Sequence, residues 1–283
     1  MTRVGIVTDT ISCIPQELIQ HHGIRIVPTG LVIDGKHYQD TELTNEEFWR
    51  LFFQAKQQPT TTAANPVDFA AAFRELAGST DSIVTVTVSK VLSATHEAAV
   101  QARKSVLEEN PNLRIEVIDS KTAAGAEGFI VLEAARAAEA GKNLDEVVGI
   151  VQDMIPRVKF AVAMDTLKYL IKSGRAPKSA IIGNMFQVKP IIGMVSGTGL
   201  VENLGRAQGK RKAMEKLVEM VKEYVDTSKP VHAMFHYTDG IAAGEELKEI
   251  MTSQIPCAEF YLTPYTPVMA SQTGPVVSVA FYS

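Results

Sequence analysis

Short apolar runs alternate with amphipathic stretches along the first half of the chain. The runs have the length of strands, and the stretches between them repeat hydrophobic positions at helical spacing. We predict strands at 3–8, 24–27, 31–33, 36–39, 82–88 and 113–118, and helices after Pro15 and over 45–53, 67–77, 94–108, 123–140 and 144–156. Strands alternating with helices favour a parallel sheet flanked by helices, which binds ligands beyond the carboxyl ends of its strands.

The second half has turn signals between its apolar runs, including Ser-Gly-Thr-Gly at 196–199. We predict strands at 158–164, 187–195, 200–204, 231–236, 258–263 and 276–281, and helices over 167–171, 206–226 and 240–252. We expect the strands at 187–195 and 200–204 to form a hairpin about the 196–199 turn. The patterns together predict an α/β protein with two domains, an N-terminal one at 1–157 with a parallel sheet flanked by helices and a C-terminal mixed α/β one at 158–283.

Ser93 lies at the start of the helix predicted over 94–108. The first turn of a helix has unpaired N–H groups and the positive end of the helix dipole, which favour a carboxylate or phosphate. Ser93 is therefore either the cap of this helix or a ligand contact. Polar side chains follow other strands of the predicted parallel sheet, and we expect them to converge with Ser93; they are Asp9, Thr10, Ser12, Asp119 and Ser120.

Three consecutive threonines, Thr60, Thr61 and Thr62, lie between two prolines. Asn65 fits the N-cap of the next helix, but this does not explain the threonines, which are either solvated loop residues or ligand contacts. The helix over 45–53 contains four aromatic residues, which we interpret as its buried stripe: Phe48, Trp49, Phe52 and Phe53.

Composition and charge exclude several classes of protein. The formal net charge of -4 and a single short basic cluster do not indicate a nucleic-acid-binding surface. The chain has no apolar run long enough for a membrane span, and its N-terminus has the pattern of a strand, not of a signal peptide. Cys13 and Cys257 are spaced for neither a zinc site nor a disulfide framework, which favours a cytoplasmic protein.

Motifs of common enzymes are absent from the sequence. There is no phosphate loop, dinucleotide fingerprint, nucleophile elbow or HExxH pair, and the six histidines have no metal-ligand spacing. We therefore expect a binding protein with no metal, no cofactor and no catalytic residue. The alternative is a transferase or hydrolase acting on a carboxylated or phosphorylated small molecule, with His96 or Asp119 as its general base.

The order of the polar loops resembles the DegV family of bacterial lipid carriers, over the whole chain. The segments that carry the resemblance, with the family motifs in parentheses, are 8–15 (DSTADLP), 27–28 with 35–40 (a hairpin), 61–66 (TSQPSP), 91–95 (LSGT), 118–120 (IDS), 173–175 (GGR), 189–192 (KPIL) and 273–275 (HTGPG).

The resemblance implies that a long-chain fatty acid lies between the two domains as the ligand. It places the carboxylate on hydroxyls of the TSQPSP-like and LSGT-like loops, with support from the GGR-like and TGP-like segments. Carried onto this chain, the implied head-group residues are Thr61, Thr62, Ser93, Thr95, Arg175, Gln272 and Thr273. Gln272 replaces a family histidine, and Ala94 replaces a family glycine, for which we expect a tighter or displaced carboxylate.

The resemblance also implies a partner, a dihydroxyacetone-kinase-like fatty acid kinase to which the acyl carboxylate is presented. Arg206, Lys210 and Arg211 lie in the basic cluster, which we expect to dock this or another protein. A family arginine important for the kinase aligns with Gln208. Nucleic acid and stable membrane insertion are not expected.

Overall fold

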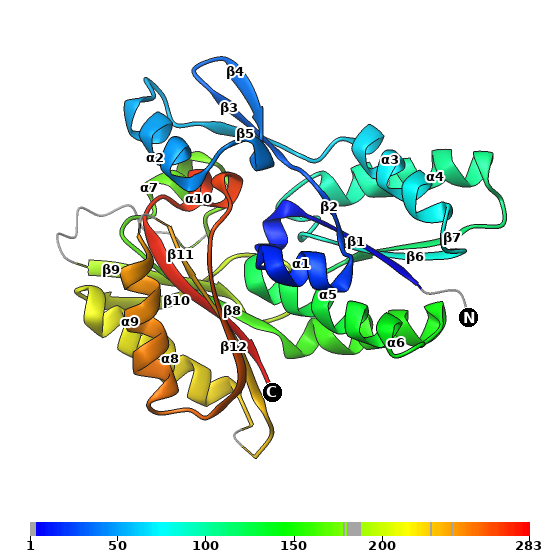
Figure 1. Cartoon of the computed structure of the whole chain (residues 1–283). Helices are drawn as coiled ribbons and strands as arrows, with labels where there is room; N and C mark the ends of the chain where they lie inside the picture. The colour runs from blue at the N-terminus through cyan, green and yellow to red at the C-terminus, as the bar shows by residue number, and fades with distance from the viewer. Residues whose placement is uncertain (1–3, 178, 180–187, 227, 239) are drawn as a thin grey trace.

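The computed structural model describes residues 4–177, 179, 188–226, 228–238 and 240–283, and their strands form three sheets (Figure 1). The first is parallel, with the order β2 (Arg25–Val27), β1 (Gly5–Asp9), β6 (Ser82–Thr87) and β7 (Arg114–Asp119). Helices α3 (Pro66–Ala77) and α4 (Thr95–Glu109) cover one face, and α1 (Gln16–His22), α5 (Ala124–Glu139) and α6 (Leu144–Arg157) cover the other. The predicted parallel sheet flanked by helices is confirmed.

The second sheet is mixed and follows α6 in the chain. Its order is β10 (Glu202–Gln208), β9 (Val188–Met194), β8 (Lys159–Met164), β13 (Val276–Tyr282), β11 (Val231–Tyr237) and β12 (Cys257–Pro264). Only the β11–β12 pair of this sheet is parallel. Helices α8 (Lys210–Tyr224) and α9 (Ile241–Thr252) pack on its outer face, which confirms the predicted mixed α/β unit.

Helix α5 packs between the two large sheets. It contacts β1 and β6 on one side and β8, β11 and β13 on the other, so nearly all of its side chains are buried. Gly125 N donates to His236 Nε2 at 3.0 Å, and a Cβ on Gly128 would lie 2.7 Å from the carbonyl oxygen of Ser12. Small residues are needed for such close packing on both sides, which explains the Ala- and Gly-rich sequence of this helix.

The third sheet belongs to a segment that we call the cap, residues 30–62. It contains β3 (Gly30–Ile33), β4 (Lys36–Gln39), β5 (Thr60–Thr62) and α2 (Asn45–Gln54). The cap packs on α10 (Pro267–Thr273), and hydrogen bonds join it to the second half of the chain: Trp49 Nε1 donates to the carbonyl oxygen of Thr238 at 2.7 Å. Gln58 Nε2 donates to the carbonyl of Tyr169, at the start of α7 (Lys168–Lys172), at 3.1 Å. A domain boundary at 157/158 stays a prediction.

Three expectations about local structure were wrong. The loop expected at 60–62 is strand β5, because its threonines pair with the distant strand β3. The helix expected over 206–226 begins only at Lys210: residues 202–208 pair with β9, and Gly209, with φ of 83°, turns the chain into α8. Phe53 is 65% exposed, whereas the other three aromatic residues of α2 are buried. Helix α10 was not predicted at all.

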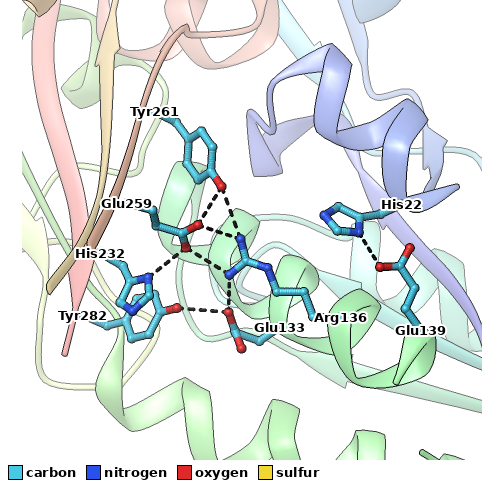
Figure 2. Close-up of polar contacts among 8 residues, drawn as sticks. All are labelled: His22, Glu133, Arg136, Glu139, His232, Glu259, Tyr261 and Tyr282. Atoms are coloured by element: carbon cyan, nitrogen blue, oxygen red, sulfur yellow. Dashed lines mark hydrogen bonds and ion pairs between the residues drawn. The ribbon is translucent and has the colours of Figure 1, made fainter. Parts of the chain in front are cut away.

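A polar network fastens α5 to the outer strand β12 (Figure 2). The Arg136 guanidinium donates from Nη1 and Nη2 to the two carboxylate oxygens of Glu259, at 2.9 and 2.7 Å, and from Nη1 to Glu133 at 2.6 Å. The two carboxylates also contact neighbouring side chains, namely His232, Tyr261 and Tyr282. Such a bidentate, partly buried ion pair is stronger than an exposed one.

We expect Glu259→Gln to lower the free energy of unfolding at pH 7 by about 2 kcal/mol. Burial raises the pKa of this carboxyl, but hydrogen bonds from Arg136, Tyr261 and His232 outweigh burial and lower the pKa to about 2. Since the folded pKa lies below the unfolded one, the stabilisation is present above about pH 4.5 and is lost as the pH falls towards 2.

Chemical denaturation at pH 7 and pH 3 measures this effect, and the difference between the two proteins should shrink at pH 3. The control is Glu109→Gln, which breaks an exposed ion pair with Arg74 and should change stability little. An equal effect of the two substitutions would contradict the prediction.

Candidate functional site

A cavity lies between the parallel sheet, the mixed sheet and the cap. It encloses about 810 Å³, including the space at its open mouth. Most of its wall is apolar, and the apolar lining residues are Ile11, Ala63, Val88, Leu92, Ala123, Phe160, Val162, Leu170, Ile192, Gly193, Met194, Val201, Tyr265, Val268 and Met269. The remaining lining residues are Thr29, Thr61, Thr62, Ser93, Arg175, Gln272 and Thr273. A largely apolar space with a few polar groups suits an amphipathic ligand.

Among the described residues that line the cavity, Arg175 is the only charged one. Its Nε donates to the carbonyl oxygen of Leu92 at 2.9 Å, and Nη1 donates to Gln272 Oε1 at 2.9 Å and to the carbonyl oxygen of Ser173 at 3.2 Å. In the described part of the chain, Nη2 has no hydrogen-bond acceptor and no carboxylate forms an ion pair with the guanidinium.

Burial lowers the pKa of Arg175, but an arginine side chain still keeps its proton in proteins. The side chain is therefore a half-buried cation that lacks an acidic partner among the described residues. A buried charge of this kind is costly unless an anion compensates it. A carboxylate in the cavity would supply that anion and accept from Nη2.

Gln272 links Arg175 to the cap. Its Oε1 accepts from the guanidinium, and its Nε2 donates to Thr61 Oγ1 at 3.3 Å. An amide has one acceptor end and one donor end, so glutamine at this position can bridge a cation and a hydroxyl without titrating. Thr62 and Thr273 also line the cavity. The Thr273 hydroxyl donates to the backbone carbonyl oxygens of Met269 and Gly274, each at 3.1 Å.

Ser93 lies on the cavity wall, one residue before the N-cap of α4, so the predicted cap position was displaced by one residue. The N-cap is Ala94, which makes no side-chain hydrogen bond, and the helix begins at Thr95. Ser93 Oγ accepts from Thr95 N at 3.3 Å and lies 2.9 Å from Thr95 Oγ1. Thr95 is buried behind Ser93, where its Oγ1 accepts from the backbone N–H of Ala64, and it does not line the cavity.

The polar loops at the carboxyl ends of the parallel strands converge as predicted, but most of their side chains hold the loops in place. Asp9 is buried and accepts from the backbone N–H groups of Ile11 at 2.9 Å and Val88 at 3.0 Å. Asp119 accepts from the N–H groups of Lys90 and Lys121. Of the six residues expected to converge, only Ser93 lines the cavity. Burial raises the pKa of Asp9 to about 7.

The apolar wall was not predicted. Phe160, Val162 and Met164 on β8 point towards α5 and the cavity side, whereas Ala161 and Ala163 between them pack under α8. This period-two alternation is the signal that could have found Phe160 and Val162. Val268 and Met269 of α10 were missed together with the helix itself, although Thr266 before Pro267 is a local helix-start signal.

The basic residues expected to dock a partner lie apart from the cavity. Arg206 is on β10, not on the helix, and Lys210 and Arg211 form the first turn of α8. All three are exposed, and Arg211 pairs with Glu215 at 3.1 Å.

The described ranges contain neither a metal-binding cluster nor a membrane-spanning helix. No cluster of three or more His, Cys, Asp or Glu side chains there could hold a metal ion. None of the helices in the same ranges is long and apolar enough to cross a membrane.

Comparison with known proteins gives matches over essentially the whole chain. The family model described as "Uncharacterised protein, DegV family" matches residues 3–283. A DegV domain-containing protein of Caldanaerobacter subterraneus is 33% identical over 285 residues, covering 100% of this chain and 99% of that protein.

Solved structures have the same fold. The structure of a DegV family protein from Thermus thermophilus, described by its fatty acid binding, has a TM-score of 0.90 and 29% identity, with 99% of each chain covered. The structure of DegV from Bacillus subtilis, described as a fatty acid binding protein, has a TM-score of 0.88 and 24% identity. The match covers 100% of this chain and 99% of that chain, and at this identity it supports the fold alone. Because the family model matches residues 3–283 and a family member is 33% identical over the chain, this chain belongs to the DegV family.

Proposed function

We propose that the protein binds a long-chain fatty acid in the cavity, with the carboxylate at Arg175 and the acyl chain along the apolar wall. The observation that carries the proposal is the half-buried Arg175 cation, whose Nη2 has no acceptor among the described residues. Thr61, Thr62, Ser93, Gln272 and Thr273 line the same cavity. The first four would complete the head-group site, and Thr273 would only pack beside it, because its hydroxyl donates to backbone carbonyls. The Thermus thermophilus relative, described by its fatty acid binding, supports the same ligand class.

Energetics favour an apolar chain over a small polar ligand. Each buried methylene contributes about 0.8 kcal/mol, so a long acyl chain gains roughly 10 kcal/mol before the costs of association. The head group then needs only a compensating charge and a few hydrogen bonds for orientation.

Native mass spectrometry tests the proposal on the purified protein. Protein from a host that makes lipids should carry an added mass equal to that of one fatty acid, or should take up one equivalent after delipidation. The methyl ester of the same acid serves as the control and should be bound less tightly, because it has no charge. A protein that carries no acyl ligand and takes up none would contradict the proposal.

We propose a carrier and not an enzyme. The two candidate general bases of the alternative, His96 and Asp119, do not line the cavity. His96 Nδ1 lies 3.1 Å from Thr87 Oγ1, and Asp119 accepts from backbone N–H groups. A transferase or hydrolase acting in this cavity would need a base that reaches its substrate.

We further propose that the carrier presents its carboxylate to a fatty acid kinase in the cytoplasm, and that Arg206, Lys210 and Arg211 dock that partner. Changing Lys210 and Arg211 to Ala should weaken capture of the dihydroxyacetone-kinase-like protein by about tenfold, since rim charges contribute modestly and mainly to association. A pull-down titrated with salt measures this effect.

The control changes Arg74 and Lys104 to Ala, two exposed basic residues on α3 and α4. Capture should be unchanged in this variant, and fatty acid binding should be unchanged in both. Undiminished capture by the Lys210 and Arg211 variant would show that this surface is not the contact.

A further inference from the structure

Asp40 is a buried acid at the edge of the cap. It directly follows β4 and is 3% exposed. Its Oδ1 accepts from the backbone N–H of Val268 at 2.7 Å, and its Oδ2 accepts from Thr29 Oγ1 at 3.3 Å. The two bonded groups are 11 and 228 residues away along the chain, so one carboxylate joins separate parts of the fold.

The bond to Val268 is a helix cap supplied from outside the helix. Val268 is the second residue of α10, and its N–H is one of the donors that a helix leaves without an internal acceptor. Thr266, the N-cap residue of α10, makes no side-chain capping bond of its own. An ionised carboxylate also interacts favourably with the positive end of the helix.

Helix α10 brings several residues to the cavity, including Val268, Met269, Gln272 and Thr273. Its Gln272 meets Thr61 of the cap at 3.3 Å and Arg175 at 2.9 Å. The position of α10 relative to the cap therefore sets the distance between the two sides of the head-group site.

We propose that Asp40 is a positioning residue for the head-group site: it holds the start of α10 against the cap and so keeps Gln272 within reach of Thr61 and Arg175. The proposal rests on the fatty acid function only for its effect on binding. Its effect on α10 is independent of any ligand.

The contacts on the other side of Asp40 support this role. Thr29 lies on the cavity wall, and its Oγ1 is 2.8 Å from Thr10 Oγ1, in the loop after β1. Thr29 N also donates to Thr10 Oγ1 at 3.1 Å. Asp40 thus joins α10 to a hydroxyl pair that links Thr29, at the entry to the cap, with the segment after β1.

Asp40 keeps its charge at a cost in stability. Burial raises the pKa of Asp40 to about 6, although hydrogen bonds from the Val268 N–H and nearby hydroxyls act to lower it. The titratable groups that face Asp40 are Asp9 and Cys13. Because the folded pKa lies above the ordinary value, ionised Asp40 disfavours the folded state above about pH 6. A neutral residue of the same shape should therefore not lower the Tm at pH 7.

The experiment compares Asp40→Ala, Asp40→Asn and a control, Asp153→Ala, which changes an exposed aspartate on α6. For Asp40→Ala, faster hydrogen exchange is expected at the amides of Val268 to Thr273. Fatty acid affinity should fall about tenfold, because α10 loses the hydrogen bond from Val268 N–H to the Asp40 carboxylate. Asp40→Asn keeps an oxygen for Val268 N–H, so its affinity should stay within about threefold of wild type without loss of Tm. The control should match wild type in every measurement.

Either of two exchange results would overturn the proposal: unchanged exchange in α10 of Asp40→Ala, or exchange that rises equally throughout the protein in both Asp40 variants. If wild-type protein takes up no fatty acid, the proposed function fails, but exchange at α10 still decides the role of Asp40. If wild type binds and Asp40→Ala binds equally well, the function stands and the positioning role is wrong.

Discussion

Replacing Arg175 with Met is expected to weaken the binding of a long-chain fatty acid by about a hundredfold, because hydrogen bonds to a charged group contribute about 1.5–3 kcal/mol each. Methionine keeps most of the apolar stem and removes the charge. Titration of delipidated protein with a fluorescent fatty acid measures the change. Arg175→Lys should fall between wild type and Met, because lysine keeps the charge but lacks the fork that also bonds Leu92 and Gln272.

The methyl ester of the same acid separates charge recognition from packing. Wild type and Arg175→Met should bind the ester with similar affinity, since the ester presents no negative charge to the guanidinium. If acid and ester lost equal affinity in the variant, Arg175 would be a packing residue and the proposed head-group position would be wrong.

Replacing Val162 with Phe is expected to weaken binding of a long-chain acid by about fiftyfold. Val162 is 2% exposed on β8 and lines the apolar part of the cavity. A larger side chain there takes the space of about three methylenes, each worth about 0.8 kcal/mol. Calorimetric titration with acids of increasing length measures the effect, which should be largest for the longest chains.

Two comparisons control this prediction. Val162→Ala removes volume at the same position and should keep binding of the long-chain acid. A shorter acid that does not reach Val162 should bind Val162→Phe and wild type alike. A loss that is the same for all chain lengths would contradict the placement of the acyl chain along this wall.

Local signals in the sequence predicted much of the fold. Proline and capping residues mark the starts of α2, α3 and α6, and the Asp34-Gly35 turn marks the β3–β4 hairpin, so these elements were confirmed within a residue or two. The apolar runs of strand length and the helical spacing between them likewise predicted both large sheets. All of these features depend on residues close together in the chain.

Features that depend on distant partners were missed. Strand β5 exists because Thr61 pairs with Leu31, and β10 extends to Gln208 because it pairs with β9. Non-local pairing overrides local propensity in both strands. Helix α10 was missed although Thr266 and Pro267 form a local start signal, as Asn65 and Pro66 do for α3; only its bond to Asp40 is non-local.

The candidate site was predicted in part. The family resemblance named Thr61, Thr62, Ser93, Arg175, Gln272 and Thr273, and all six line the same cavity. Thr95 lies behind that wall. The absence of an acceptor for Arg175 Nη2 among the described residues could not be predicted, because it depends on which groups the fold places around the guanidinium.

A crystal structure of the protein with a bound long-chain fatty acid tests the central claim most directly. We predict elongated density along Phe160, Val162 and Ile192, ending in a carboxylate within hydrogen-bond distance of Arg175 and of Thr61 or Ser93. A ligand whose polar end lies away from these three residues, or a cavity that stays empty at saturating fatty acid, would contradict the account.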